Sequence, residues 1–207
     1  TEIADIVSTY SKYNLIRKAE VQTPRIYSYV NHHEADKVLN KWKAVVEKAE
    51  SIYEKIDPAY KDAYYQLVLY PAKASAGVAE MYISCGLNNL YAKQGRVSAN
   101  DYAKRAEALF ELDKQLSDYY NNTMSNGKWK GMMSDIHIGY TAWSMPRANK
   151  LPDLNVVTPL SEPTMGIAVE GSELSWPSLD SKIQPTLPTF DVMKKNAYYI
   201  DVFNRGN

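Results

Sequence analysis

Apolar residues recur at intervals of three and four through the first two-thirds of this 207-residue sequence, and this repeat constrains the fold more than any other feature. The spacing places apolar side chains on one face of an α-helix, and such a face must be buried against another element. We expect helices over about residues 2–18, 32–56, 58–94 and 98–121. Short connections make neighbours antiparallel, so the sequence predicts a mainly α fold, an antiparallel bundle of four or five helices.

Helix boundaries carry recognisable signals. Asn31 followed by Glu34 matches a capping box at the start of the second helix. Asp57 before Pro58 predicts a side-chain cap followed by a proline in the first turn of the third helix. Pro71 should kink or break that third helix, because proline lacks the N–H group that an interior position needs.

The last third of the chain has a different character. Residues 151–163 are polar and proline-rich, which is typical of a linker. Met165–Val169 and Ala197–Phe203 are strand-like, and two strands make a poor domain alone. We therefore expect a helical domain at 1–155, then a linker and the first strands of a truncated β-sandwich at 156–207. A third strand is expected to follow Asn207, which leaves a short, incomplete β-portion.

Composition excludes several functions. Lys and Arg together number 24, as do Asp and Glu, so the charge balance argues against nucleic acid or an anionic membrane as partner. No apolar run is long enough to span a bilayer. Cys85 is the only cysteine and lies in an apolar helical stretch, so we interpret it as a small core residue.

No complete catalytic constellation is recognisable. The three histidines are the adjacent pair His32 and His33, which is a poor metal pair, and the distant His137. Phosphate loops, nucleophile elbows and zinc-ligand spacings are absent from the sequence. We expect no metal, no cofactor and no catalytic residue in this chain.

One segment, residues 128–143, is rich in aromatic residues and lacks helical periodicity. Its His137, Tyr140 and Trp143 are the candidate substrate-contact residues, because rings stack on sugar faces while imidazole and phenol donate hydrogen bonds. Two other interpretations stay open. The segment either plugs the end of the bundle, with His137 bonded to a backbone carbonyl, or packs against another domain.

Several stretches, in the same order along the chain, resemble family 115 of the glycoside hydrolases. They are Tyr13-Asn14, Tyr64-x-Gln66-Leu67-Val68-Leu69-Tyr70-Pro71, Asn89-Leu90-Tyr91-Ala92-x-Gln94-Gly95-Arg96, Trp129, Met132-Met133, His137-Ile138-Gly139-Tyr140-Thr141-x-Trp143, Met165-Gly166-x-Ala168-Val169-Glu170-Gly171 and Tyr199-Ile200-Asp201-Val202-Phe203. The resemblance covers essentially the whole chain. It departs at Ala19, where the family has proline, and at Leu15-Ile16, where smaller or more polar residues are expected.

The resemblance implies a xylan α-(4-O-methyl)glucuronidase whose acid and base lie on a separate catalytic barrel. The chain would then be the helical domain that packs beside that barrel and takes part in dimer contacts. Alone it is expected to be inactive, with xylan or glucuronoxylan met only through the parent enzyme. A periplasmic or secreted bacterial location follows from the family. The alternative is a stand-alone carbohydrate-binding or dimerisation module.

Overall fold

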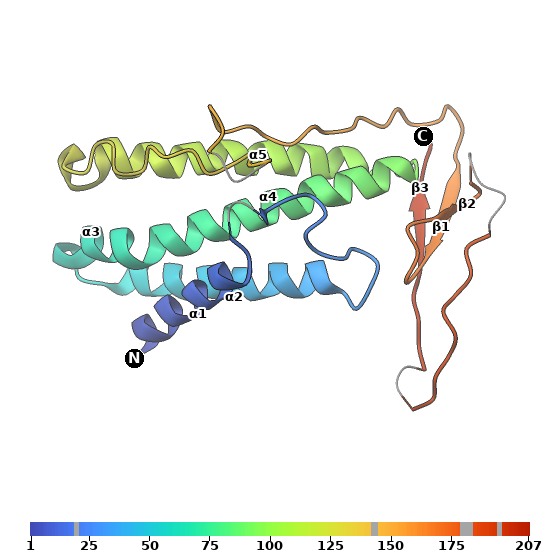
Figure 1. Ribbon diagram of the computed structural model, residues 1–207, viewed down its shortest axis with the longest axis horizontal. Helices are drawn as coiled ribbons and strands as arrows, with labels where there is room; N and C mark the ends of the chain where they lie inside the picture. Colours follow the sequence, from blue (N-terminus) through green and yellow to red (C-terminus); the bar gives the residue numbers. More distant parts are fainter. Residues whose placement is uncertain (19–20, 142–144, 179–183, 194–195) are drawn as a thin grey trace.

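The computed structural model describes residues 1–18, 21–141, 145–178, 184–193 and 196–207. Four helices pack together, and a small antiparallel sheet of three strands follows them (Figure 1). The predicted mainly helical fold with a short β-portion is confirmed. Ala19, where the sequence departs from the family, and Trp143, which is part of the resemblance, lie outside the described residues.

The long helices have nearly the predicted bounds: α1 Glu2–Ile16, α2 Glu34–Lys55, α4 Tyr70–Lys93 and α5 Ala99–Asp118. The four-residue α3, Lys61–Tyr64, leads into α4. In Figure 1, α2, α4 and α5 lie side by side, and α4 is in the middle. Since α4 contacts α1, α2 and α5, it needs apolar residues on almost every side, and its sequence supplies them.

The local hydrogen bonds show whether the side-chain caps predicted at two helix starts are present. Asp57 accepts a bond of 2.8 Å from the Ala59 N–H, as predicted, although the turn it caps is a 3₁₀ turn. The capping box at Asn31 was wrong. His33, in a left-handed conformation, precedes α2, and the Glu34 carboxylate instead accepts from the Ser28 N–H at 2.8 Å. The connector folds back on the helix start, so its own backbone donor takes the carboxylate.

Pro71 does not break the third helix. A π-helical turn, Tyr65–Leu69, joins α3 to α4, and the proline sits in the first turn of α4. The wider turn lets the Tyr70 N–H donate to the Tyr65 carbonyl. Pro71 has no N–H for the Leu67 carbonyl, and the Tyr10 hydroxyl of α1 donates to that oxygen at 3.0 Å. The predicted distortion is therefore present, but it precedes the proline and leaves the helix continuous.

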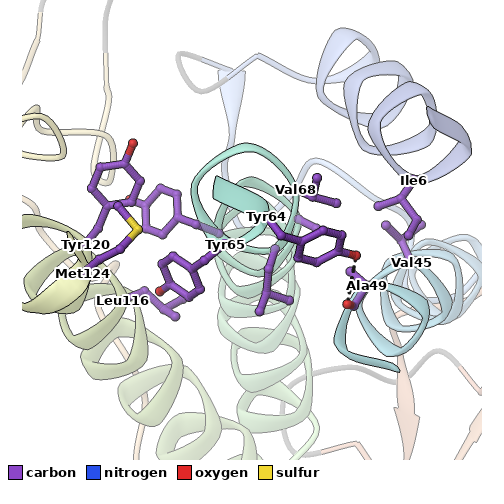
Figure 2. Close-up of a cluster of buried hydrophobic side chains, with 12 residues drawn as sticks. Ile6, Val45, Ala49, Tyr64, Tyr65, Val68, Leu116, Tyr120 and Met124 are labelled. Carbon is purple, nitrogen blue, oxygen red and sulfur yellow. Dashed lines mark hydrogen bonds between the residues drawn. The ribbon is translucent and has the colours of Figure 1, made fainter. Parts of the chain in front are cut away.

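Tyrosines dominate the core at this end of the bundle (Figure 2). The Tyr64 hydroxyl donates to the Ala49 carbonyl at 3.0 Å, which satisfies a polar group inside an otherwise apolar cluster. Tyr65 meets Tyr119 edge-on with ring centroids 4.9 Å apart. The abundance of tyrosine in the sequence thus reflects helix packing in this part of the molecule.

The sheet has the order β2-β1-β3, with β1 Met165–Val169, β2 Ser175–Trp176 and β3 Ile200–Asn204. The prediction for β1 is confirmed, whereas β3 begins three residues later than predicted. The two-residue β2 was not predicted. Gly166 pairs with Phe203 and Ala168 with Asp201. This face is turned toward the bundle, because Arg96 contacts both Asp201 and Phe203.

Two buried arginines join the sheet to the end of the bundle. Arg96 lies between the rings of Tyr91 and Phe203, with its guanidinium carbon 4.2 and 4.0 Å from their centroids. It also donates to Asp201 at 3.0 Å. Arg205 of the last residues donates to the Gln94 carbonyl at 2.9 Å. The predicted domain boundary at residue 155 stays a prediction. The hydrogen bonds of Arg96 and Arg205 connect residues on the two sides of this boundary.

Candidate functional site beside His137

The segment after α5 runs back along the side of the bundle. Asn121 exchanges two hydrogen bonds of 2.9 Å with the Met133 backbone, and Asn88 does the same with Asn155 at 2.8 and 2.9 Å. Between these anchors, Ile138 is fully buried against α4 and α5. The segment therefore lies along the side of the bundle, held there by these amide side chains, while Trp129 and Met133 near its start pack against the tyrosine-rich cluster. Closure of the bundle end by this segment stays a prediction.

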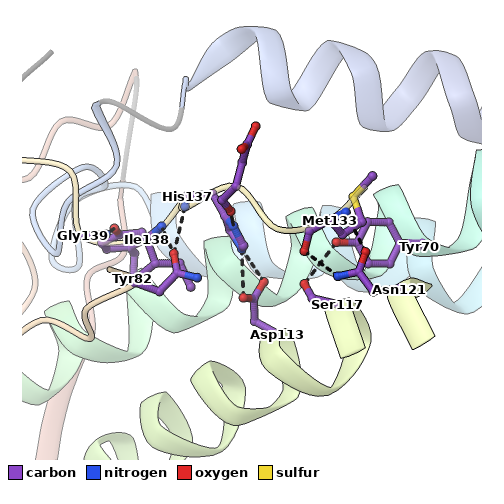
Figure 3. Close-up of polar contacts among 11 residues, drawn as sticks. Tyr70, Tyr82, Asp113, Ser117, Asn121, Met133, His137, Ile138 and Gly139 are labelled. Atoms are coloured by element: carbon purple, nitrogen blue, oxygen red, sulfur yellow. Dashed lines mark hydrogen bonds and ion pairs between the residues drawn. The ribbon is translucent and has the colours of Figure 1, made fainter. Parts of the chain in front are cut away.

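His137 is anchored at both ring nitrogens (Figure 3). Its Nε2 lies 2.9 Å from both carboxylate oxygens of the buried Asp113, and its Nδ1 lies 2.9 Å from the Asp135 carbonyl. Both partners are acceptors, so this geometry favours a ring protonated on both nitrogens. The pKa of His137 is accordingly raised, first by the hydrogen bond to Asp113, against an opposing effect of burial. The plug interpretation predicted a hydrogen bond between His137 and a backbone carbonyl, and the Asp135 carbonyl is that partner.

The other two candidate residues are placed differently. The Tyr140 hydroxyl donates to the Ile136 carbonyl at 3.3 Å, and its side chain is half-buried. Gly139 beside it has a φ of +93° and donates its N–H to the Tyr82 hydroxyl at 3.0 Å. A side chain at Gly139 would also meet the Lys150 backbone, so glycine is required there. Trp143 lies outside the described residues, and contact of the three residues with substrate stays a prediction.

A cavity of about 410 Å³ opens beside His137, between α1, the connector after it, α4 and the 132–137 stretch. Its polar wall is formed by Asn14, Arg17, Gln22 and Asp135. Asn14 donates to the Ser75 hydroxyl at 2.9 Å, which ties α1 to α4 across the cavity. Sequence reasoning missed this wall because its residues lie far from His137 along the chain and sit on ordinary polar helix positions.

Gln22 carries the one described polar side-chain atom that is buried without a hydrogen-bond partner among the described residues, its Oε1. Leaving a buried acceptor unsatisfied costs about 1–3 kcal/mol. The amide stands at the lining of the cavity, where a bound group would change its surroundings. Gln22 itself lines the cavity, but this oxygen is covered, so a ligand would reach it only after the amide turns about its last side-chain bond.

The Cys85 thiol is buried in the bundle. Burial raises the pKa of the Cys85 thiol to about 12, so the thiolate that a nucleophile needs is scarce near neutral pH. Within the described ranges, no group of three or more His, Cys, Asp and Glu side chains is placed to hold a metal ion. Among the described helices, none combines the length and apolarity that a membrane crossing requires.

A scan of protein-family models found no family that matches this chain, and a search of curated proteins found no matching sequence. The chemistry of the site is therefore defined by its own side chains. An imidazole held by two acceptors is a poor general base, whereas the cavity beside it, with its polar wall, is suited to binding.

Proposed function

We propose that this chain is a non-catalytic helical domain, with the first strands of a β-sandwich, from an enzyme that resembles the xylan α-(4-O-methyl)glucuronidases of family 115. It packs beside the catalytic barrel of the parent chain, which supplies the acid and the base. The proposal rests on the family resemblance in the sequence, and one observation in the structure gives it physical support.

That observation is the outer face of the small sheet. Met165, Val202 and Ile200 are 60, 66 and 51% exposed, and Trp176 of β2 is 46% exposed. Ile167 pairs with both Trp176 and Val202, so these side chains share one face across all three strands. The opposite face lies on the bundle. An apolar face that is exposed across all three strands marks a surface that another element covers.

A second sheet is the usual cover for such a face, at about 10 Å from the first. This supports the interpretation of residues 156–207 as the opening of a sandwich. The hydrogen bonds of His137 support the proposal that the domain is non-catalytic. Both ring nitrogens already bond to Asp113 and Asp135, so neither is available to a substrate.

The test is release of 4-O-methylglucuronic acid from glucuronoxylan. The chain alone is expected to release none, and a longer polypeptide that joins it to its barrel is expected to be active. Release by the chain alone would contradict the proposal, as would an inactive longer polypeptide that is folded. A dimerisation module is the second candidate, because the same apolar face would pair with its copy; sedimentation of the chain at several concentrations separates the two.

A further inference from the structure

The cavity beside His137 has two chemically different walls. Ala74 and Val78 of α4, with Met132 and Met133 of the returning segment, form an apolar wall. The rest of the lining includes the amides, the guanidinium and the carboxylate of the polar wall. A pyranose ring has the same division, since its C–H groups form an apolar face and its hydroxyls project around the rim.

We propose that this cavity binds a neutral, pyranose-sized sugar. Its volume of about 410 Å³ lies within the range of about 300–1,000 Å³ that is usual for small-molecule sites. The site would be independent of the catalytic barrel, and it therefore goes beyond the function proposed above.

The charges at the cavity favour a neutral ligand over an ion. Arg17 and protonated His137 are positive, and Asp113 and Asp135 are negative, so the two signs balance. The Asp135 carboxylate at the lining would repel an anion, and the Arg17 guanidinium would repel a cation. Hydroxyl groups suit this setting because each is both a donor and an acceptor.

The polar wall and the neighbouring Ser75 together have one unused hydrogen-bond donor and one unused acceptor. The Ser75 hydroxyl accepts from Asn14, so its own hydrogen remains available to a ligand oxygen. Gln22 Oε1 accepts nothing from the described residues, and the amide turns easily about its last side-chain bond. A sugar hydroxyl would then donate to the Gln22 oxygen and accept from Ser75.

Several fixed contacts hold the walls in place before any ligand arrives. The Asn14–Ser75 bond joins α1 to α4, while the His137–Asp113 and Met133–Asn121 bonds hold the returning segment on α5. Such preorganisation lowers the ordering cost of binding.

The experiment is titration of the chain with D-xylose and D-glucose up to about 100 mM, a concentration at which millimolar affinity saturates a site. The readout is the imidazole Cε1 proton resonance of His137, followed by NMR. Sodium D-glucuronate is the acidic comparison. We expect a saturable shift with at least one neutral sugar and weaker binding of glucuronate.

Two variants on the same helix locate the site. Ala74→Trp fills the cavity and is expected to weaken binding by at least about tenfold. Gly77→Ala, where an added Cβ meets open space in the groove on another face, is the matched control and should bind as the parent does. Gln22→Leu, which removes the amide without filling the cavity, gives a second measure if Ala74→Trp does not fold.

Three results would overturn the proposal. They are no shift with either neutral sugar, tighter binding of glucuronate than of both neutral sugars, and unchanged binding in folded Ala74→Trp or Gln22→Leu. None of these results depends on the activity of a parent enzyme, so this proposal and the function proposed above fail separately.

Discussion

The Tyr10 hydroxyl donates a hydrogen bond of 3.0 Å to the Leu67 carbonyl, the backbone acceptor that Pro71 leaves without its usual partner. A side chain of α1 thus replaces a backbone donor of α4. The bond links the distortion of one helix to the docking of another, and it explains why a proline is tolerated within a continuous helical run.

Tyr10→Phe should lower the free energy of unfolding by about 1 kcal/mol, because it removes this bond and leaves the Leu67 carbonyl without it. Urea denaturation measures the change. Tyr60→Phe, at an exposed tyrosine, is the control and should have little effect. In a Pro71→Ala background the cost of Tyr10→Phe should shrink, since the introduced alanine supplies its own backbone N–H; an equal cost in both backgrounds would contradict this account.

His137 should make stability depend on pH. Its folded pKa is raised above the unfolded value of about 6.5, so its stabilising effect is complete below the unfolded pKa and is lost as pH rises through the folded pKa. The stability difference between the parent and His137→Gln should therefore be larger at pH 5.5 than at pH 9. His32→Gln, at an exposed histidine, is the control. A difference that grows with pH would show that the ring is not held in its charged form.

Two glycines of α4 should respond in opposite directions to alanine. A Cβ at Gly86 would collide with the Tyr29 side chain and the Pro24 carbonyl, so Gly86→Ala should destabilise the protein by about 1–3 kcal/mol. Gly77→Ala meets nothing within 4 Å and should stabilise the helix by up to about 1 kcal/mol. Thermal unfolding of the two variants checks both signs, and a stable Gly86→Ala would mean that the connector over α4 is free to move.

Arg96→Lys should loosen the sheet from the bundle. Lysine keeps the charge but loses the planar group between Tyr91 and Phe203, at a cost of about 2 kcal/mol. Hydrogen exchange should show faster exchange of the β1 and β3 amides with little change in α5. Arg105→Lys, at a solvent-exposed arginine, is the control. Equal loss of protection throughout the chain would contradict a local effect.

Val202→Lys should reduce self-association of the isolated chain. The substitution puts a charge on the exposed apolar face of the sheet and leaves the opposite, bundle-facing side untouched. The dissociation constant of any dimer, measured by sedimentation equilibrium, should rise by at least about tenfold. The control Lys43→Glu, on α2 and outside the sheet, should leave the dissociation constant unchanged. If Val202→Lys also left the dissociation constant unchanged, the chain would associate through another surface.

The sequence predicted the long helices well, because their apolar spacing has a single physical interpretation. It failed where two groups compete for one partner: Glu34 was expected to complete a capping box with Asn31, but its carboxylate accepts from the Ser28 N–H, and the Asn31 N–H donates to the Ser28 hydroxyl. The two-residue β2 was too short to have a periodicity of its own.

The candidate site was only partly predictable. His137 stood out as a lone histidine in an irregular, aromatic segment, whereas Asp113 belongs to a regular helix and looked like one polar position among many. Asn14 and Ser75 are 61 residues apart, and only the packing of α1 on α4 brings them together. No local pattern carries that information.

The turn between α4 and α5 is completed from the far end of the chain. Val97 donates its N–H to the Asn204 carbonyl, and Arg96 reaches Asp201, 105 residues later. On the ribosome, both helices therefore emerge well before the residues that seal the turn between them. Until β3 is synthesised, the Arg96 guanidinium lacks its carboxylate and one of its two rings, so this end of the nascent bundle is incomplete.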